Sequence, residues 1–320
     1  MPKRQAERTV LFVEVRAFPI ACHRLRDHAL VRRPLGVCGD RDGTMQLLSV
    51  SSEALRCGLR PGWAADEALQ LCPQVVLVPA EPELYRVVHE QLLLALRGVA
   101  DSVQPLRLGA AWAEATGRSA MLGRGLAAAG VVLGRLSLEV GLPVAVGVGP
   151  NRLLAQAAAR EIPGRPAGGS GARALSRADV PSRLWPLPAT ELPAVGPALS
   201  RRLSDWGIAT VGDIASRGPG WWERQLGATG ARLWGAAHGR DDTPVGGRPP
   251  LGAWVTACPP APRRVRHPVG GDKHRPPSVG RRTACSAMAQ GEAAQAVVLP
   301  PQWLSPATAA RCRTGPSQGR

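Results

Sequence analysis

The first 160 residues alternate between short apolar runs, which are typical of strands, and amphipathic segments, which are typical of helices. A buried strand is predicted at residues 9–15, where the run TVLFVEV is interrupted once, by Glu14. Further strands are expected at residues 34–38, 45–50, 75–78, 102–108 and 143–149, and helices at residues 51–58, 63–71, 83–99, 120–140 and 151–161. Such alternation favours a mixed sheet layered with helices, so the expected fold class is α+β.

Residues 174–245 follow a helical pattern instead. Within them, residues 192–214 (LPAVGPALSRRLSDWGIATVGDI) predict the end of one short helix at residues 192–193, a tight turn, a second helix, and a following helix that Thr210 and Asp213 cap. The turn is expected around Gly196, which permits a left-handed or strained backbone. Pro197 suits the first position of the second helix, because no amide hydrogen is needed there. Gly207 is a usual C-terminal cap for that helix.

This helix pair is a candidate DNA-binding device. The backbone amides that open a helix lack internal partners, and the helix dipole makes that end attractive to a phosphate. The residues predicted to contact a DNA backbone are Val195, Gly196, Ala198, Arg201 and Arg202. The alternative is an ordinary pair of helices with a glycine turn.

The charge balance agrees with a polyanionic partner. The 320 residues include 40 Lys+Arg against 24 Asp+Glu, which gives a net charge of +16. Lys3 and Lys273 are the only lysines, so arginine, the better bidentate phosphate ligand, carries nearly all of the positive charge. Nucleic acid is the commonest partner of such a chain, although a GC-rich coding sequence gives the same bias.

Residues 246–320 are rich in Pro, Gly and Ser and show little periodicity. With 11 basic residues against two acidic ones, they carry +9 of the net charge. We expect this tail to be largely disordered, as either a non-specific nucleic-acid-binding extension or a solvated one without function. Four potential zinc ligands in the tail have no recognised spacing, and unrelated residues are the preferred interpretation: Cys258, His267, His274 and Cys285.

Other bulk properties exclude whole classes of protein. No apolar run reaches the roughly 18 residues that a membrane span needs, and the N-terminal MPKRQAERT leads directly into the first strand. We therefore expect neither a membrane span nor a signal peptide. The seven cysteines are scattered without a CxxC pair, which is typical of a reduced, cytoplasmic protein.

Four segments carry a resemblance to a known family: residues 51–88 (SSEALRCGLRPGWAADEALQLCPQVVLVPAEPELYRVV), 144–158 (VAVGVGPNRLLAQAA), 192–214 and 233–245 (LWGAAHGRDDTPV). In this order they resemble the Y-family (UmuC/DinB-type) translesion DNA polymerases. The resemblance implies a palm and fingers at residues 1–165 and a helical thumb with a helix-hairpin-helix at residues 174–245. The family's little-finger domain is not recognisable in residues 246–320, which we interpret as truncated, degenerate or read in a shifted frame.

The resemblance also implies a two-metal site for nucleotide transfer, and the chain departs from the family there. The first acidic pair of the family falls on Glu14 and Arg16, and the second falls on Gly109 and Ala110. One carboxylate remains and a cation replaces another, so Mg²⁺, which needs several oxygen ligands, is expected to bind very poorly. We interpret Glu114 as a surface or structural glutamate, and we expect Glu14 to pair with Arg16 or another arginine.

The positions that hold the nucleotide in the family are altered as well. The tyrosine and arginine that would hold the triphosphate fall on Ser52 and Leu55, and the usual lysine falls on Arg152. The aromatic residue that screens the sugar falls on Pro19. The resemblance therefore leaves Arg152 and Ser52 as candidates for binding a nucleotide phosphate.

This pattern is similar to that of the ImuB-type branch, polymerase-shaped accessory proteins that have lost the catalytic acids. The resemblance implies a DNA-binding subunit of DNA repair and translesion synthesis in the SOS response. Such a subunit links DNA, a sliding clamp and an active error-prone polymerase, and needs no Mg²⁺ of its own. Two alternatives stay open: an active polymerase that uses Mg²⁺ through Glu14 and unconventional ligands, and a truncated or decayed relative without a stable fold.

Overall fold

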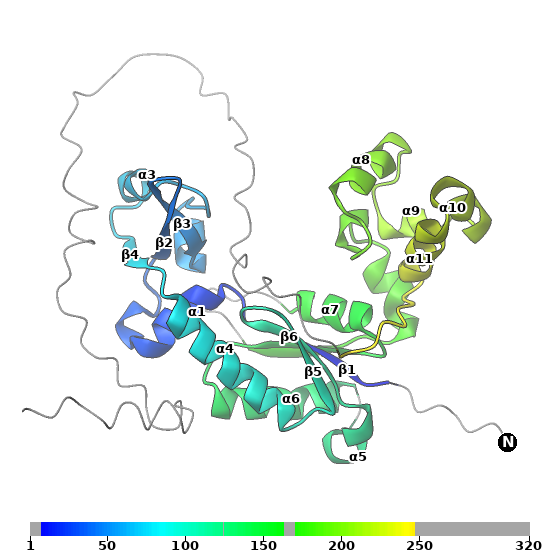
Figure 1. Cartoon of the computed structure of the whole chain (residues 1–320), viewed down its shortest axis with the longest axis horizontal. Coiled ribbons are helices and arrows are strands. Elements are labelled where there is room, and N and C mark those ends of the chain that lie inside the picture. The colour runs from blue at the N-terminus through cyan, green and yellow to red at the C-terminus, as the bar shows by residue number, and fades with distance from the viewer. Residues whose placement is uncertain (1–7, 124, 163–169, 247–320) are drawn as a thin grey trace, which may run out of the picture. The chain divides into compact units, whose positions relative to one another are not determined.

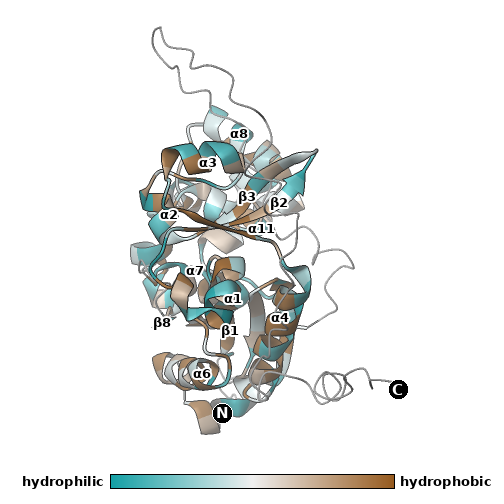
Figure 2. Cartoon of the chain, turned by 90° about the vertical axis from the view of Figure 1, so that its left-hand side faces the viewer, coloured by the Kyte–Doolittle hydropathy of each residue, from teal (hydrophilic) through white to brown (hydrophobic). Residues whose placement is uncertain are grey.

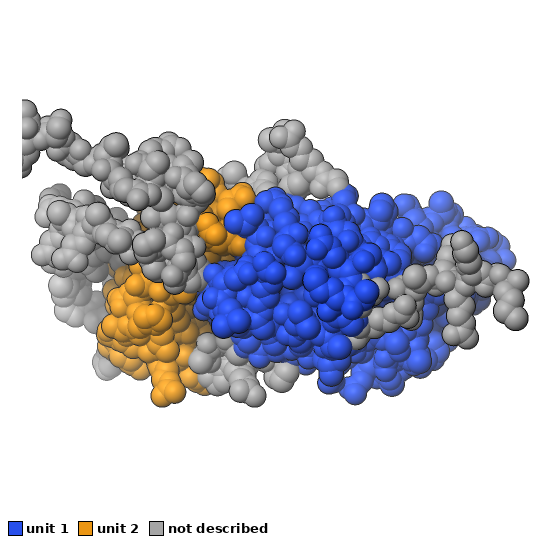
Figure 3. Space-filling model, turned by 90° about the horizontal axis from the view of Figure 1, so that it is seen from below, with its two compact units in different colours: residues 1–16, 92–164, 168–253 blue, residues 17–91, 165–167, 254–320 orange. Residues whose placement is uncertain are grey.

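The computed structural model describes three stretches of the chain, residues 8–123, 125–162 and 170–246. The described residues divide into two compact units, which Figure 3 colours separately. The first unit contains residues 8–16, 92–162 and 170–246, and the second contains residues 17–91. The domain limits predicted at residues 165, 174 and 246 stay a prediction.

The first unit is built on a sheet whose described strands follow the order β5-β6-β1-β7-β8 (Figure 1). These strands are β1 (Val10–Glu14), β5 (Ser102–Arg107), β6 (Ala110–Glu114), β7 (Ala145–Gly149) and β8 (Gly171–Ala174). The central strand β1 pairs antiparallel with β6 and β7, whereas β7 and β8 are parallel. Every residue of β1 except Glu14 is buried, as an apolar run with helices on both faces of the sheet requires.

Two helices cover this sheet on opposite faces, α6 (Leu126–Glu139) and α7 (Arg152–Arg160) (Figures 1 and 2). Val10 and Phe12 share a buried cluster with Ala155 and Ala159 of α7. The close approach depends on glycine in β7, because a Cβ atom on Gly147 would lie 2.0 Å from the carbonyl oxygen of Ala155. The run AVGVG therefore sets the distance between the sheet and α7.

The single helix predicted at residues 120–140 is wrong. The structure contains α5 (Ser119–Leu122) and α6, with Gly123 and Gly125 between them at φ values of +76° and +54°. Helical residues need φ near −63°, so these left-handed glycines interrupt the helix. The sequence pattern also predicts neither β6 nor β8 as a strand.

The segment after β8 is helical, as predicted. It contains short 3₁₀ and π turns at Arg177–Asp179, Val180–Leu184 and Ala189–Glu191, and the helices α8 (Pro197–Asp205), α9 (Val211–Ala215), α10 (Pro219–Leu226) and α11 (Ala228–Ala237). Thr210 and Asp213 form the predicted capping box of α9. Trp222 and Leu233 are fully buried and share a cluster with Leu154 of α7, so this segment packs on a helix of the sheet layer.

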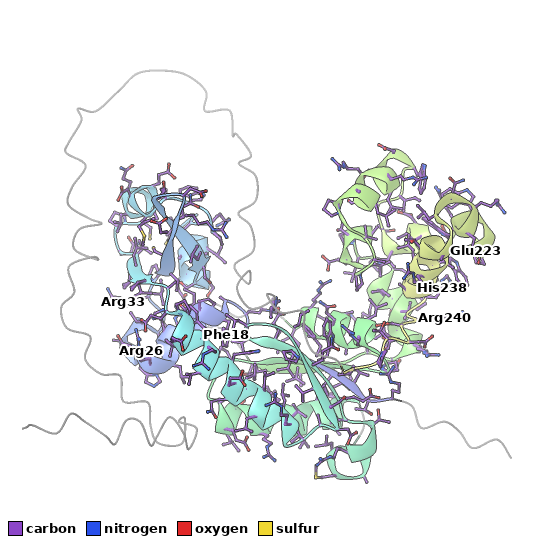
Figure 4. All side chains as sticks on the ribbon, in the orientation of Figure 1. Phe18, Arg26, Arg33, Glu223, His238 and Arg240 are labelled. Carbon is purple, nitrogen blue, oxygen red and sulfur yellow. The ribbon has the colours of Figure 1, made fainter. Side chains whose placement is uncertain are left out.

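The second unit contains a smaller sheet, whose described strands follow the order β3-β2-β4. Its elements are β2 (Leu35–Arg41), β3 (Thr44–Val50), β4 (Val76–Pro79), α1 (Phe18–Arg26), a 3₁₀ turn (His28–Leu30), α2 (Ser52–Arg56), α3 (Ala65–Leu71) and the start of α4 (Pro82–Arg97). Asp42 and Gly43 both have positive φ and make the β2–β3 hairpin. The Ser51 side chain caps α2 by accepting the amide of Ala54. Arg26 of α1 donates to Glu81 at 2.7 Å, beside the start of α4 (Figure 4).

Two further sequence expectations concern a membrane span and a zinc site. Within the described residues, no helix combines the length and apolarity that crossing a membrane requires. Residues 247–320 lie outside the described residues, and with them the zinc candidates Cys258, His267, His274 and Cys285. Their interpretation stays a prediction.

The tight β7–α7 contact predicts a severe defect for a single methyl group. Gly147→Ala should destabilise the chain by more than the roughly 1 kcal/mol of an average substitution, because backbone atoms of α7 occupy the space. Gly134→Ala is the control, since no described atom lies within 4 Å of its new Cβ on α6. Alanine in that exposed helix should stabilise by up to about 1 kcal/mol.

Urea unfolding measures both variants. Equal stabilities of Gly147→Ala and the parent chain would contradict the close packing. A broad, uncooperative transition of the parent chain itself would favour the decayed-relative alternative.

A second prediction concerns acid stability. Arg8 donates two hydrogen bonds to Glu114, at 3.0 and 2.9 Å, and these bonds lower the pKa of Glu114 against the opposing effect of burial. A carboxylate whose pKa is lower in the folded state stabilises above its unfolded value of about 4.3, and that stabilisation is lost as the pH falls through the folded pKa. Glu114→Gln should therefore reduce the loss of folding free energy below about pH 4.5 by up to about 1 kcal/mol, and the fall in Tm there should be flatter.

Glu83→Gln is the matched control, because Glu83 forms an exposed pair with Arg86. Its profile of Tm against pH should follow that of the parent chain. If the Glu114→Gln profile also overlaps the parent profile, the part-buried pairing with Arg8 does not contribute to stability.

Candidate functional site

The four positions that carry acidic residues in the family meet at the end of the central strand β1. Glu14 is the last residue of β1 and lies opposite Ala110 of β6. The next amide, that of Val15, donates to the carbonyl oxygen of Gly109 at 2.7 Å, and Arg16 follows. The structure therefore brings these positions together and leaves one carboxylate among them.

Glu14 is engaged by an arginine that the sequence does not single out. Arg107, at the end of β5, donates from its guanidinium to the Glu14 carboxylate. A bulge between Pro105 and Arg107 places Arg107 opposite Ala110, so Glu14, Ala110 and Arg107 form one row across three strands. Side chains of such a row share one face of the sheet, and the small Ala110 leaves room for the charged pair.

Arg16 points to a different partner. Its guanidinium donates to the carbonyl oxygen of Ala159 at 3.0 Å, in the last turn of α7. The last carbonyl groups of a helix lack intrahelical partners and carry a partial negative charge, which favours a cation there. The expectation that Glu14 pairs with an arginine is confirmed, and the partner is Arg107 rather than Arg16.

The donor set of this row does not fit a pair of magnesium ions. Mg²⁺ demands near-octahedral oxygen coordination, and a two-metal centre must hold two such ions about 3.5–4 Å apart. The four family positions offer the carboxylate of Glu14 alone, which is 15% exposed and already bonded to a guanidinium. Across the described ranges, no cluster of three or more His, Cys, Asp or Glu side chains is placed to hold a metal ion.

Arg152 lies at the start of α7 with its charge stacked on an aromatic ring. Its guanidinium carbon is 3.8 Å from the ring centre of Trp112 on β6, and Trp112 in turn lies 5.6 Å from the ring of Phe12. Burial lowers the pKa of Arg152, and the Asp241 carboxylate acts in the opposite direction. A guanidinium that stacks through its face keeps its edge N–H groups for an anion, so Arg152 can still contact a phosphate.

The first turn of α7 is capped by groups of the chain itself. The side chain of Asn151 accepts the amide of Leu154 at 2.9 Å, and Asp241 accepts the amide of Leu153 at 3.2 Å. Asn151 also donates to the carbonyl oxygen of Gly239 at 2.7 Å. A phosphate placed at this helix end would compete with the Asp241 carboxylate for the same amides.

Ser52, the other candidate for a nucleotide phosphate, belongs to the second unit and begins the five-residue helix α2. Its hydroxyl donates to Glu53 at 3.3 Å, and Glu53 is paired with Arg24 at 2.8 Å. Leu55, the family's arginine position, is 41% exposed and offers no charge. Joint action of Ser52 and Arg152 on a nucleotide stays a prediction.

The predicted turn before α8 is present. The amide of Val195 donates to the carbonyl oxygen of Leu192 at 2.9 Å, which closes the turn, and Pro197 is the first residue of α8. Gly207, at φ +68°, follows the end of the helix as expected. The side chains of Ala198, Arg201 and Arg202 on this helix are exposed.

The expectation of a left-handed or strained Gly196 is wrong. Its φ of −82° and ψ of 175° describe an extended backbone, which residues before a proline prefer. None of the described atoms would lie within 4 Å of a Cβ atom on Gly196. Within the described residues, neither the backbone nor the packing requires glycine at this position.

Three residues that shape these sites have no clear sequence signal: Arg107, Trp112 and Asp241. Arg107 reaches Glu14 only because of the bulge in β5, which its sequence does not reveal. Asp241 caps a helix start that lies 88 residues earlier in the chain. Trp112 lies in the segment compared with the second acidic pair of the family, but that comparison does not indicate that its ring carries Arg152.

Comparisons with known proteins show which family this chain is similar to. Residues 13–160 match the sequence model of the impB/mucB/samB family. DNA polymerase IV of Moorella thermoacetica is 33% identical and that of Pelotomaculum thermopropionicum 32% identical, each over 240 residues. Each alignment covers 74% of this chain and 58% of the relative, so the chain spans less than two thirds of these relatives' length.

The same fold occurs in solved structures. A Dbh ternary complex with partially disordered substrates gives a TM-score of 0.63 at 25% identity, over 74% of this chain and 68% of that chain. The solved structure therefore shares the mixed α+β architecture described above. By sequence and by fold, the matched part of this chain is that of a Y-family DNA polymerase.

Proposed function

We propose that this protein binds DNA and acts in DNA repair and translesion synthesis as an accessory subunit that does not transfer nucleotides itself. One observation carries the proposal: the Glu14 carboxylate is engaged by Arg107, and the other acidic positions of the family are Arg16, Gly109 and Ala110. In this proposal residues 1–165 supply a palm and fingers, residues 174–245 a thumb, and residues 246–320 a basic tail.

The chemistry of nucleotide transfer explains why these changes weigh against activity. The primer hydroxyl must be activated and the charge of the transferred phosphoryl group must be neutralised, and paired metal ions do both in the family's reaction. A guanidinium can neutralise a phosphate, but it does not coordinate and activate an attacking oxygen. Arg16 and Arg107 therefore favour the binding of an anion without favouring its transfer.

DNA binding is assigned to the hairpin before α8, through Val195, Gly196, Ala198, Arg201 and Arg202. Gly196 leaves the start of α8 uncovered, and the two arginines are exposed on the same helix. The amides at a helix start and nearby arginines are the usual ligands of a backbone phosphate. The resulting helix-hairpin-helix would contact the DNA backbone without regard to base sequence.

The partners follow from the lack of a catalytic centre of its own. A DNA-binding subunit without nucleotide transfer needs an active polymerase beside it, and the resemblance to the ImuB-type branch implies one, together with a sliding clamp, in the SOS response. Arg152 and Ser52 would retain contacts to a nucleotide phosphate. Mg²⁺ would not be required.

An active error-prone polymerase is the second candidate. It is favoured by the retained Glu14 and by relatives that are DNA polymerases of type IV. In that case Glu14 would provide the one remaining carboxylate ligand for Mg²⁺, with unconventional groups in place of the others.

Primer extension separates the two candidates. The parent chain, mixed with a primer–template, all four nucleotides and Mg²⁺ or Mn²⁺, should extend no primer above background, because Glu14 alone cannot hold two ions. Glu14→Ala should behave identically. Template-dependent extension that disappears in Glu14→Ala would establish the active polymerase and overturn the accessory role.

The hairpin assignment predicts that Gly196→Val weakens DNA binding without unfolding the chain. The valine fits the extended backbone but obstructs the approach of a phosphate, so the dissociation constant should rise about tenfold, the equivalent of losing one charged hydrogen bond of about 1.5 kcal/mol. Fluorescence anisotropy with labelled duplex DNA measures the change. Gly130→Val is the control, since that glycine faces open space on α6.

Both variants should melt near the parent temperature. Equal DNA affinities of Gly196→Val and Gly130→Val would remove the hairpin from the DNA-binding surface.

A further inference from the structure

Two tryptophans and two arginines of the helical segment form a stacked group, the Arg–Trp stack, made of Arg202, Trp206, Trp221 and Arg217. The guanidinium carbon of Arg202 lies 4.8 Å from the ring centre of Trp206, and that of Arg217 lies 4.6 Å from the ring centre of Trp221. The two indoles meet edge to face, with their centroids 5.3 Å apart. The stack thus runs from cation to ring to ring to cation between the end of α8 and the start of α10.

The rings of the stack are anchored in the core. Trp222 is fully buried, and its ring lies 4.8 Å from that of Trp221 and 6.3 Å from that of Trp206. The indole N–H of Trp222 donates to the carbonyl oxygen of Ile214 at 3.0 Å. Trp206 and Trp221 themselves remain partly exposed, so a rigid aromatic surface carries the two arginines.

Each arginine of the stack is held in place and still has donors for a ligand. Arg217 donates to the carbonyl oxygen of Trp206 at 3.2 Å, and Arg202 donates to that of Gln225 at 3.3 Å. A guanidinium has five N–H donors, and each of these hydrogen bonds uses one of them. Stacking occupies the face of the group and leaves its edge free to bind in the ring plane.

Neither cation of the stack is held in a close ion pair. Among the described residues, neither Arg202 nor Arg217 forms an ion pair within 4 Å. The nearby Asp213 carboxylate accepts the amides of Ala209 and Thr210 instead, at 3.0 and 2.8 Å. Asp213 therefore offsets only part of the charge of Arg217, from beyond ion-pair distance, and two fixed guanidinium groups in this position are suited to an anion from outside the chain.

We propose that the Arg–Trp stack is a second contact to the DNA backbone, in which Arg202 and Arg217 each bind a phosphate while Trp206 and Trp221 position them. This inference rests on the proposed DNA binding and extends it beyond the hairpin. Arg217, Trp206 and Trp221 are new to the site, and Arg202 joins the hairpin to the stack.

The spacing along α8 agrees with one continuous DNA contact. Arg202 lies six residues after Gly196, which corresponds to about 9 Å along a helix. A DNA strand advances only about 3.4 Å along the duplex axis per phosphate, so two groups about 9 Å apart reach different phosphates. The hairpin and the stack can therefore bind the same strand at once.

An acidic protein segment is the rival ligand for two arginines, and the charge of the whole chain favours DNA over it. The net charge is +16 and nearly all of it comes from arginine, whose planar group binds phosphate bidentately. A regular array of phosphates also satisfies several such groups simultaneously. If removing the charge of Arg217 does not change DNA binding, the stack binds an acidic protein segment instead or has a structural role.

The test is the salt dependence of DNA binding by the full chain. Each phosphate contact contributes about 0.9 to the slope of log K against log salt concentration. Arg217→Gln should lower this slope by about one unit and weaken binding several-fold at low salt. Arg232→Gln removes the same charge from an exposed position on α11 outside the stack, and it should leave the slope nearly unchanged.

Two further variants separate positioning from charge. Trp221→Phe keeps an aromatic ring and both arginines but weakens the cation–ring contact, so it should keep the slope and lose about two- to fivefold in affinity. Arg217→Lys keeps the charge without the planar stacked group. It should restore most of the slope that Arg217→Gln loses, with only part of the affinity.

The outcomes distinguish this inference from the proposed function. If the parent chain shows no salt-dependent DNA binding, the proposed DNA-binding role itself fails. If the parent chain binds and Gly196→Val weakens it, but Arg217→Gln matches Arg232→Gln in slope and affinity, the hairpin role stands and the stack is not a DNA contact. If Arg217→Gln no longer melts cooperatively, Arg217→Lys and Trp221→Phe decide the test. Both must then keep most of the salt slope of the parent chain with reduced affinity, and a parent-like affinity of both variants would overturn the inference.

Discussion

The contact between β7 and α7 is the constraint on which the first unit depends. Gly147 and Gly149 let the helix approach so closely that a Cβ atom on either would lie within 2.7 Å of the α7 backbone. Once placed, α7 serves every neighbouring part: its last turn accepts Arg16, its first turn carries Arg152, and its outer face contributes Leu154 to the core of the helical segment. The charged groups around the end of β1 therefore depend on a backbone distance that two missing side chains allow.

Much of this fold follows from local sequence, and the exceptions are non-local. Ser51, Asp42–Gly43 and the Thr210–Asp213 box act within a few residues, and each lies where its own chemistry predicts. β8 is different, because it is a strand only through its parallel pairing with β7. The glycine break before α6 has a local cause, but the apolar pattern of residues 120–140 continues across it and conceals it.

The candidate sites divide in the same way. The positions that meet at the end of β1 could be predicted from the resemblance, because strand register is shared by a whole fold. The partner of Glu14 could not, since Arg107 reaches it through a bulge and Arg16 turns instead toward α7. Gly196 shows the reverse error: glycine is expected for its backbone freedom, and the structure instead leaves open space around an ordinary extended residue.

The row at the end of β1 also bears on how far this chain lies from a metal-dependent enzyme. Replacing Arg16 by an acid would add one carboxylate, but Glu14 would remain bonded to Arg107. Removing Arg107 would free Glu14, but Gly109 and Ala110 would still contribute no oxygen ligand from their side chains. A hard cation gains little from each change alone, because coordination requires several oxygens at once. Loss of the ligands and gain of the arginines thus act in the same direction. Each carboxylate lost weakens the binding of a metal ion that would repel a nearby guanidinium, and each guanidinium makes the return of a single carboxylate less useful to a metal ion.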